Sequence, residues 1–288
     1  MNETTADPEK PAAQDAPKQA GRQLPPFSPG RFQHELAFDG LLRTGAGVSL
    51  FAAFFTLLSF GGGSSVVAAA LAIAIVVGWI VLSALGAKVA QALPGVTALL
   101  ENNAAVGEST LAELLSKRAL PRGLRLMLFH RLAMLRHRQQ NFVESSAIAQ
   151  TLLTTPRPGP AAANRAHLLL MLAEARLELR DAAGAWLALV ELARTPLGLT
   201  EALQRMALNT RYALLVNQPA YALAGFEQKM SLSELMPAPQ CGAFHAMLAA
   251  AAKRVDRDDW FEQIWPRVEL LCSEEEIAHM HESRLISG

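Results

Sequence analysis

This 288-residue chain has only two cysteines and two tyrosines, and its formal net charge at pH 7 is zero. The two cysteines, Cys241 and Cys272, have neither CxxC nor metal-ligand spacing, so we expect buried thiols in a reducing compartment rather than a disulfide framework. Basic and acidic residues number 26 each, which gives no electrostatic basis for binding nucleic acid. Tyrosine, isoleucine and threonine are rare while alanine and leucine dominate, and this composition favours helix over sheet.

The sequence also lacks the common motifs of catalysis and cofactor binding. It contains no P-loop, GxGxxG, HExxH or GxSxG pattern. His279 and His281 are alternate residues, which point about 200° apart on a helix and do not converge on a metal. Asp256, Asp258 and Asp259 lack the rest of a calcium loop. We therefore expect no enzyme activity, no cofactor and no metal site.

Charged residues are missing altogether from the 44 residues between Arg43 and Lys88, and mean hydropathy of the chain is positive, at +0.19. One helix of that length would measure roughly 66 Å, whereas a bilayer core is about 30 Å thick. The sequence therefore predicts a transmembrane hairpin over residues 44–87, with spans near 44–61 and 65–86 and a glycine-rich turn between them. A signal peptide and a buried soluble hairpin are the alternatives, and the 43 preceding residues disfavour the first.

Small residues recur every four positions in the second span, at Ala70, Ala74 and Gly78. Such spacing lets a partner helix approach closely in a membrane, although it also arises by chance in an alanine-rich segment. We predict a membrane-helix packing role for these three residues.

Flanking charge predicts the orientation of the hairpin. From Leu114 to Val143 there are seven Lys or Arg residues and no acidic residue, which places both termini in the cytoplasm by the positive-inside rule. This basic stretch either lies against anionic headgroups or forms a solvated helix face. Alanine, leucine and arginine usage is typical of a GC-rich bacterium, so we expect an integral protein of the bacterial inner membrane. Residues 1–43 are expected to form a disordered Pro/Ala-rich cytoplasmic tail and residues 88–108 a juxtamembrane linker.

Helical periodicity and an internal repeat extend over residues 109–288, which open with a predicted capping box at Thr110 and Glu113. The pattern Phe129-x-x-Leu132-Ala133-x-x-Arg136 recurs forty residues later as Leu169-x-x-Leu172-Ala173-x-x-Arg176. The residues expected to enter the second helix of each pair are spaced by 40, 39 and 39; they are Phe142, Ala182, Tyr221 and Trp260.

This pattern resembles tetratricopeptide repeats, and QQNFVESSAIAQTLL and NQPAYALAGFEQ are the stretches most similar to the family's second-helix entry. The period exceeds the family's roughly 34 residues, and alanine (Ala133, Ala173, Ala213) replaces the usual glycine of the first helix. The expected fold is all-α, with a transmembrane helical hairpin followed by a tetratricopeptide-like α-solenoid of about four helix pairs. An irregular helical bundle is the alternative.

The resemblance implies that the first helix of each pair lines a concave groove that holds a peptide segment or helix. Carried over by register, the groove residues are Met127, His130, Met134, Arg138, His167, Glu174, Glu178, Thr210, Asn217 and His245. A solvated inner face without a ligand is the alternative. The expected function is a membrane-anchored scaffold or adaptor whose partners are proteins and membrane lipid. A self-assembling structural component, or an accessory subunit of a membrane complex, is the alternative.

Overall fold

The computed structural model describes residues 26–59, 66–118, 120–156 and 164–282. Within these ranges the chain forms 13 α-helices and no β-strand, and helices that are consecutive in sequence pack against one another. The helices are α1 (Pro29–Ser59), α2 (Val66–Asn102), α3 (Ala104–Ser116), α4 (Arg122–Arg138), α5 (Phe142–Thr154), α6 (Arg165–Glu178), α7 (Ala182–Ala193), α8 (Leu199–Leu215), α9 (Pro219–Leu223), α10 (Phe226–Ser233), α11 (Ala238–Arg254), α12 (Asp258–Leu271) and α13 (Glu274–Glu282).

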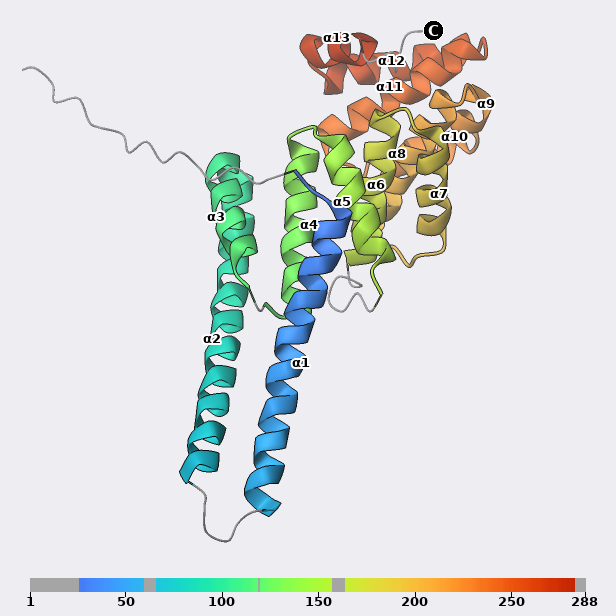
Figure 1. Cartoon of the computed structure of the whole chain (residues 1–288). Helices are drawn as coiled ribbons and strands as arrows, with labels where there is room; N and C mark the ends of the chain where they lie inside the picture. The colour runs from blue at the N-terminus through green and yellow to red at the C-terminus, as the bar shows by residue number, and fades with distance from the viewer. Residues whose placement is uncertain (1–25, 60–65, 119, 157–163, 283–288) are drawn as a thin grey trace, which may run out of the picture.

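The helices α1 and α2 run side by side as a long two-helix arm, and the lower half of this arm projects away from the remaining helices (Figure 1). The predicted turn at residues 61–65 lies outside the described residues. Ala70 and Ala74 are exposed, and nothing lies within 4 Å of where a Cβ on Gly78 would be. The predicted small-residue strip is therefore not used to pack α2 against α1.

The arm is longer than the two predicted spans because both helices continue into the rest of the protein. Residues 29–43, expected to be disordered, form the first half of α1. Phe32 and Leu36 are buried, and the Phe32 ring lies edge-on to Phe129 of α4, with ring centroids 4.6 Å apart. These contacts with residues far along the chain give the segment a surface on which to fold.

The predicted linker at residues 88–108 is helical as well. Val89, Leu93, Val96 and Leu100 recur every three or four residues on α2 and are all buried. The next helix, α3, begins after Asn103, whose side chain accepts a hydrogen bond from the backbone N–H of Val106.

The capping box predicted at Thr110 is wrong, because α3 begins six residues earlier, at Ala104. Thr110 lies inside the helix, and its hydroxyl donates to the carbonyl of Val106. Ser273 and Glu276 do form a capping box. The Glu276 carboxylate accepts a 2.8 Å hydrogen bond from the backbone N–H of Ser273, and the Ser273 hydroxyl accepts one from the backbone N–H of Glu276. This box starts α13, which follows the last helix pair.

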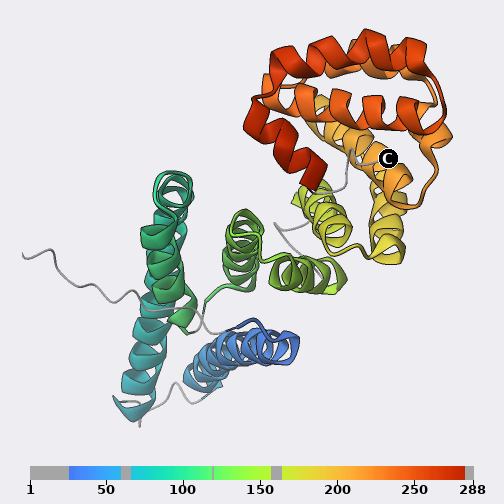
Figure 2. The same cartoon turned by 90° about the horizontal axis from the view of Figure 1, so that it is seen from above.

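Four helix pairs follow the arm: α4–α5, α6–α7, α8 with α9 and α10, and α11–α12. Seen from above, they succeed one another in an arc that leads away from the arm (Figure 2). The interior comprises two hydrophobic clusters, one reaching from α1 to Leu208 of α8 and the other from Leu203 of α8 to α12.

The two helices of every pair are joined by the same turn. One residue in each turn has a positive φ of 55–58°, and these residues are Gln140, Arg180, Asn217 and Asp256. The next backbone N–H donates to a carbonyl five residues back, as from Asn141 to Arg136 and from Arg257 to Ala252. This is the hydrogen bond of a helix-terminating Schellman motif. The turns are spaced by 40, 37 and 39 residues, so the interval between the second and third turns, which holds α7 and α8, is shorter than the sequence repeat indicated.

The second helix of the third pair is interrupted. It begins as α9, becomes extended at Ala224, and resumes as α10 after Gly225, whose φ is +69°. Glycine adopts this left-handed conformation without the steric cost that a Cβ would add. Tyr221, expected to enter a helix as regular as the others, lies in the short α9.

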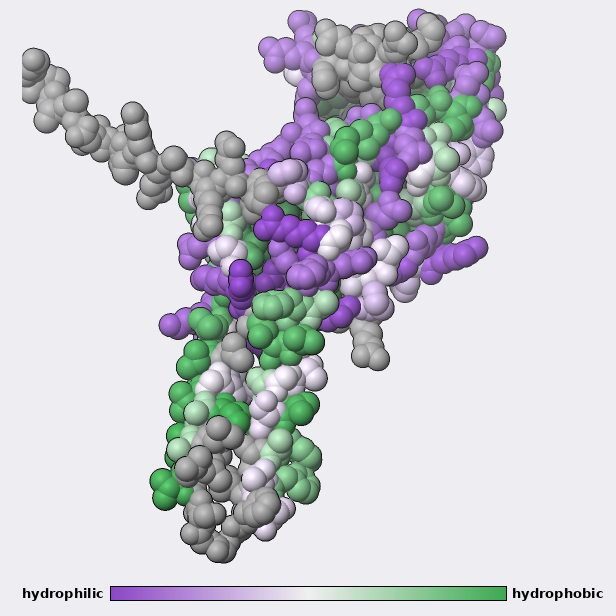
Figure 3. Space-filling model, in the orientation of Figure 1, coloured by the Kyte–Doolittle hydropathy of each residue, from purple (hydrophilic) through white to green (hydrophobic). Residues whose placement is uncertain are grey.

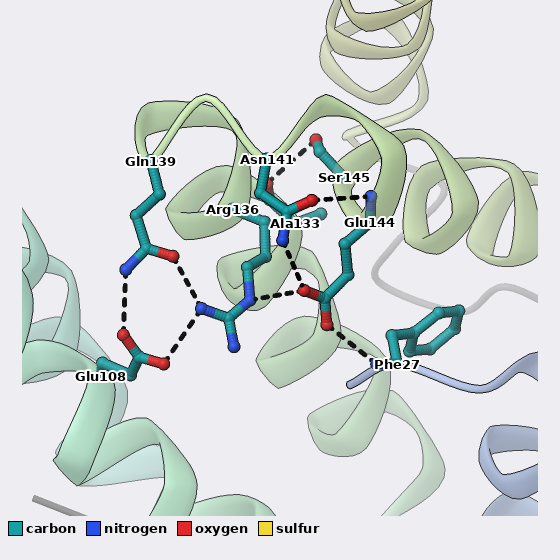
Figure 4. A network of polar contacts seen from close by, with 8 residues as sticks. All are labelled: Phe27, Glu108, Ala133, Arg136, Gln139, Asn141, Glu144 and Ser145. Atoms are coloured by element: carbon teal, nitrogen blue, oxygen red, sulfur yellow. Dashed lines mark hydrogen bonds and ion pairs between the residues drawn. The ribbon is translucent and has the colours of Figure 1, made fainter. Parts of the chain in front are cut away.

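A polar network fastens the arm to the first helix pair (Figure 4). The Arg136 guanidinium of α4 lies 3.0 Å from a carboxylate oxygen of Glu108 on α3 and 2.9 Å from one of Glu144 on α5. Glu144 also accepts a 2.9 Å hydrogen bond from the backbone N–H of Phe27, just before α1. One arginine thereby links α3, α4 and α5, and through Glu144 the start of α1.

Candidate peptide-binding groove

A concave cavity of about 480 Å³ opens among the helix pairs. Its walls come from α4, α6, α8 and α11, which are the first helices of the four pairs, and from Met236 just before α11. These first helices contact one another in the order α4, α6, α8, α11. Side chains at equivalent positions on successive helices therefore gather in one place.

The floor of the cavity is apolar and rich in methionine. It is lined by Met134, Leu170, Met171, Ala207, Leu208, Met236, Ala243 and Met247. Methionine is unbranched and polarisable, and it adapts to apolar groups of different shape. The floor therefore suits the apolar side chains of a bound segment.

The remaining lining is polar: His137, Arg138, His167, Glu174, Gln204, Arg211 and Gln240. His137 Nε2 lies 3.1 Å from a carboxylate oxygen of Glu174. Arg211 donates to Glu178 at 2.7 Å, and Arg138 donates to the carbonyl of Leu100 at 3.2 Å. The first two contacts join α4, α6 and α8 in a polar rim around the apolar floor, and the third joins the end of α4 to α2.

The surroundings fix the charge of two rim residues. Burial opposes ionisation of Glu174, but the hydrogen bond with His137 and the charges of His137 and Arg211 outweigh it and lower the pKa of this carboxyl. Burial, followed by the charge of Arg131, lowers the pKa of His167. At neutral pH the rim therefore carries an ionised Glu174 beside a neutral His167.

Four of the residues predicted from sequence line this cavity together: Met134, Arg138, His167 and Glu174. Glu178 lies beside it, because it pairs with the lining residue Arg211. Sequence reasoning thus located the α4 and α6 walls.

Met127 and His130 lie behind the α4 wall. Met127 is half-buried against the hydrophobic core, and His130 is 4% exposed. The His130 ring is edge-on to His167, with ring centroids 5.4 Å apart, and no described residue offers its Nε2 a hydrogen bond. Burial, with the nearby His167 and Arg131, lowers the pKa of His130 to about 4.

Thr210, Asn217 and His245 lie outside the cavity. Thr210 is buried, and its hydroxyl donates to the carbonyl of Met206. Asn217 is the residue with positive φ in the third turn. His245 is buried, and its Nε2 lies 2.7 Å from the hydroxyl of Ser233. The third turn comes 37 residues after the second, whereas the alignment of Ala213 with Ala173 in the first helices assumed 40. A slip of three residues rotates a side chain by roughly 60° around a helix, which moves it off the lining face.

The residues that sequence reasoning missed follow from the turns. The residue six positions before the left-handed residue lines the cavity in each of the first three pairs. It is Met134 in the first pair, Glu174 in the second and Arg211 in the third. The residue nine positions before the left-handed residue also lines the cavity in the second, third and fourth pairs, where it is Met171, Leu208 and Met247 respectively. An alignment anchored on the turns would have found Arg211 and the methionines.

No group of three or more His, Cys, Asp or Glu residues that could hold a metal occurs in the described part of the chain. Ser233, His245 and Cys241 do lie together, with Cys241 Sγ 3.7 Å from His245 Nε2. All three side chains are buried, so this cluster is closed to a substrate.

No protein-family model matches this chain, and no curated protein or solved structure matches it.

Proposed function

We propose that this protein is a membrane-anchored adaptor that binds a partner protein in the groove between its helix pairs. In this proposal the arm spans the bacterial inner membrane as a helical hairpin, with both termini in the cytoplasm, and the helix pairs form a tetratricopeptide-like solenoid. The observation that carries the proposal is the apolar cavity walled by the first helices of all four pairs.

The apolar character of the arm supports a membrane anchor. Among the described residues, one helical segment is long and apolar enough to cross a membrane: Ile73–Leu100 of α2, with a hydropathy of 2.2. Only 12% of its most apolar window is buried inside the protein, whereas a core helix of that composition would be mostly buried. The uncharged part of α1, residues 44–59, is shorter and lies beside it.

The repeated turn supports a solenoid. Four helix pairs end their first helix in the same way and stack in sequence order. Stacked pairs of this kind bury faces that a single pair leaves exposed, and they create extended concave surfaces.

The lining favours a peptide segment or helix as the ligand. Apolar side chains of an amphipathic segment would rest on the methionine floor, while its polar groups would meet Glu174, Arg211 and the glutamines of the rim.

A self-assembling role is the second candidate. Its support is the strip of Ala70, Ala74 and Gly78, which faces away from α1 and leaves room for the same strip of another copy.

The decisive experiment fills the groove. Ala207 and Ala243 line the cavity and are half-buried, so Ala207→Phe together with Ala243→Phe would occupy it without opening the core. The full-length protein and this variant would be captured from detergent-solubilised membranes, and the co-purifying proteins compared.

The matched control places the same two substitutions outside the groove, at the exposed Ala183 and Ala193 of α7. A partner that is retained by the control and lost from the groove variant supports the adaptor. A partner retained by both variants rejects the groove. Recovery of further copies of the chain alone, from both variants, favours self-assembly.

A further inference from the structure

Five basic residues from three helices and one loop lie where the arm meets the helix pairs. They are Arg43 of α1, Lys88 of α2, Lys117 and Arg118 of the loop between α3 and α4, and Arg122 at the start of α4, and we call them the basic collar. In the space-filling view a hydrophilic band covers this junction, directly above the apolar lower part of the arm (Figure 3).

Two close approaches place these residues at one level. A Cβ on Gly86 would lie 3.1 Å from the ring of Pro121 and 3.3 Å from the Arg43 guanidinium, so α2, α1 and the α3–α4 loop meet at Gly86. The carbonyl of Lys117 accepts a 2.8 Å hydrogen bond from Arg125, which also pairs with Asp39, one helical turn from Arg43. The loop that carries Lys117 and Arg118 is thereby fixed against both helices of the arm.

The length of α2 sets the depth of this level in a membrane. Gly86 lies 20 residues after Val66, the first residue of α2, which amounts to roughly 30 Å along the helix axis. A bilayer core is about 30 Å thick. An arm that spans the bilayer from the start of α2 therefore brings Gly86, and the collar around it, to the depth of the phosphate groups.

The balance of charge in the collar is positive. Lys88, Arg118 and Arg122 are exposed. Lys117 pairs with Glu113 at 3.5 Å, while Glu35 and Asp39 are turned toward Arg125. Basic residues near a membrane surface attract anionic lipid, whereas zwitterionic headgroups offer them no net charge.

We propose that the basic collar binds the headgroups of anionic phospholipids in the membrane that holds the arm, and so seats the helix pairs against its surface. This inference rests on the proposed membrane anchor.

The test uses the full-length protein in micelles that contain equal amounts of phosphatidylglycerol and phosphatidylcholine, with retained lipids counted by native mass spectrometry. The wild type is expected to retain phosphatidylglycerol preferentially. The variant Lys88→Gln, Lys117→Gln, Arg118→Gln removes three charges, each worth about fivefold in affinity near a membrane surface, so its preference should fall at least tenfold. Arg122 is left intact because its guanidinium holds the carbonyl of Pro156 at the end of α5.

The matched control neutralises three exposed basic residues through Arg194→Gln, Lys253→Gln and Arg267→Gln, and it should keep the wild-type preference. These residues follow α7 or lie on α11 and α12, helices that lie away from the arm (Figure 1). Equal retention of the two lipids by the wild type, or an unchanged preference in the collar variant, would overturn the inference.

A second experiment distinguishes failure of the collar from failure of the membrane anchor. It measures whether the protein pellets with purely zwitterionic vesicles after a carbonate wash. A protein that fails to pellet lacks the anchor, and the collar proposal falls with it. A protein that pellets without preferring phosphatidylglycerol keeps the anchor and loses only the collar.

Discussion

The guanidinium group of Arg125, on α4, lies against the carboxylate of Asp39, on α1, and each of these side chains is only 3% exposed. The same guanidinium is 2.9 Å from Glu35. A charge is costly to bury without a partner, so these groups stabilise the junction only while they remain together.

Removing one member of this pair should therefore be more harmful than removing both. Arg125→Leu leaves Asp39 without its guanidinium partner in the interior, and we expect it to lower the free energy of unfolding by about 3–5 kcal/mol. Urea unfolding of the full chain in detergent micelles, followed by circular dichroism, measures the change. The double variant Asp39→Leu, Arg125→Leu should recover much of the loss. A double variant no more stable than the single one would show that burial of the Asp39 carboxylate without the Arg125 guanidinium is not the source of the cost.

The contact between α2 and α3 depends on a missing side chain. A Cβ on Gly107 would lie 2.7 Å from Leu100 Cδ2 and 3.0 Å from the Leu100 backbone. We expect Gly107→Ala to lower the melting temperature, at a cost of about 1–3 kcal/mol for the forced displacement. Gly95→Ala is the control, since nothing lies within 4 Å of its Cβ position, and it should stabilise α2 by up to about 1 kcal/mol. Equal effects of both substitutions would contradict the close approach.

The left-handed turns predict an unusual response to glycine. Arg180 has a φ of 56° and an exposed side chain, so Arg180→Gly relieves the strain of a Cβ in this region and should stabilise the protein by about 0.5–1 kcal/mol. Leu179→Gly, one position earlier at a φ of −76°, should destabilise it, because glycine there only adds freedom to the unfolded chain. Thermal unfolding of the two variants distinguishes them by the sign of the shift.

Burial of His130 predicts a loss of stability in mild acid. Its pKa falls from 6.5 to about 4 on folding, so between these values the unfolded chain binds a proton that the native chain does not. Stability contributed by the neutral ring is present above pH 6.5 and is lost as the pH falls toward 4, by about 2–3 kcal/mol at pH 4.5. Replacement by His130→Leu removes this contribution. Urea unfolding at pH 7 and pH 4.5 should show a smaller loss for the variant than for the wild type, and identical losses would refute the prediction.

The helical character of the chain and the positions of its helix pairs were predictable from the sequence, because a forty-residue pattern and helical periodicity are local signals. The groove face was predictable only in part. Arg138 and Glu174 were found because the first two turns are forty residues apart, as the sequence repeat is, while Arg211 was missed because the interval from the second turn to the third is three residues shorter. A period does not reveal where one pair loses residues.

The upper part of the arm was missed for another reason. Phe32, Leu36 and Asp39 form too short a pattern to predict a helix by themselves. Their partners Phe129 and Arg125 lie nearly a hundred residues further on, and only the tertiary structure brings them together. Burial of Asp39 is especially hard to predict from sequence, since an acidic residue ordinarily indicates an exposed position.

The buried ion pair between Asp39 and Arg125 also constrains the order in which parts of this protein can fold during synthesis. Asp39 and Arg125 are separated by 86 residues, and a ribosome adds roughly 5–20 residues per second. Asp39 therefore exists for about 4–17 s before Arg125 has been synthesised. Throughout that interval the carboxylate lacks its buried partner and must stay hydrated. The upper part of α1 can therefore dock only after α4 has emerged, and both α2 and α3 are made before it does so.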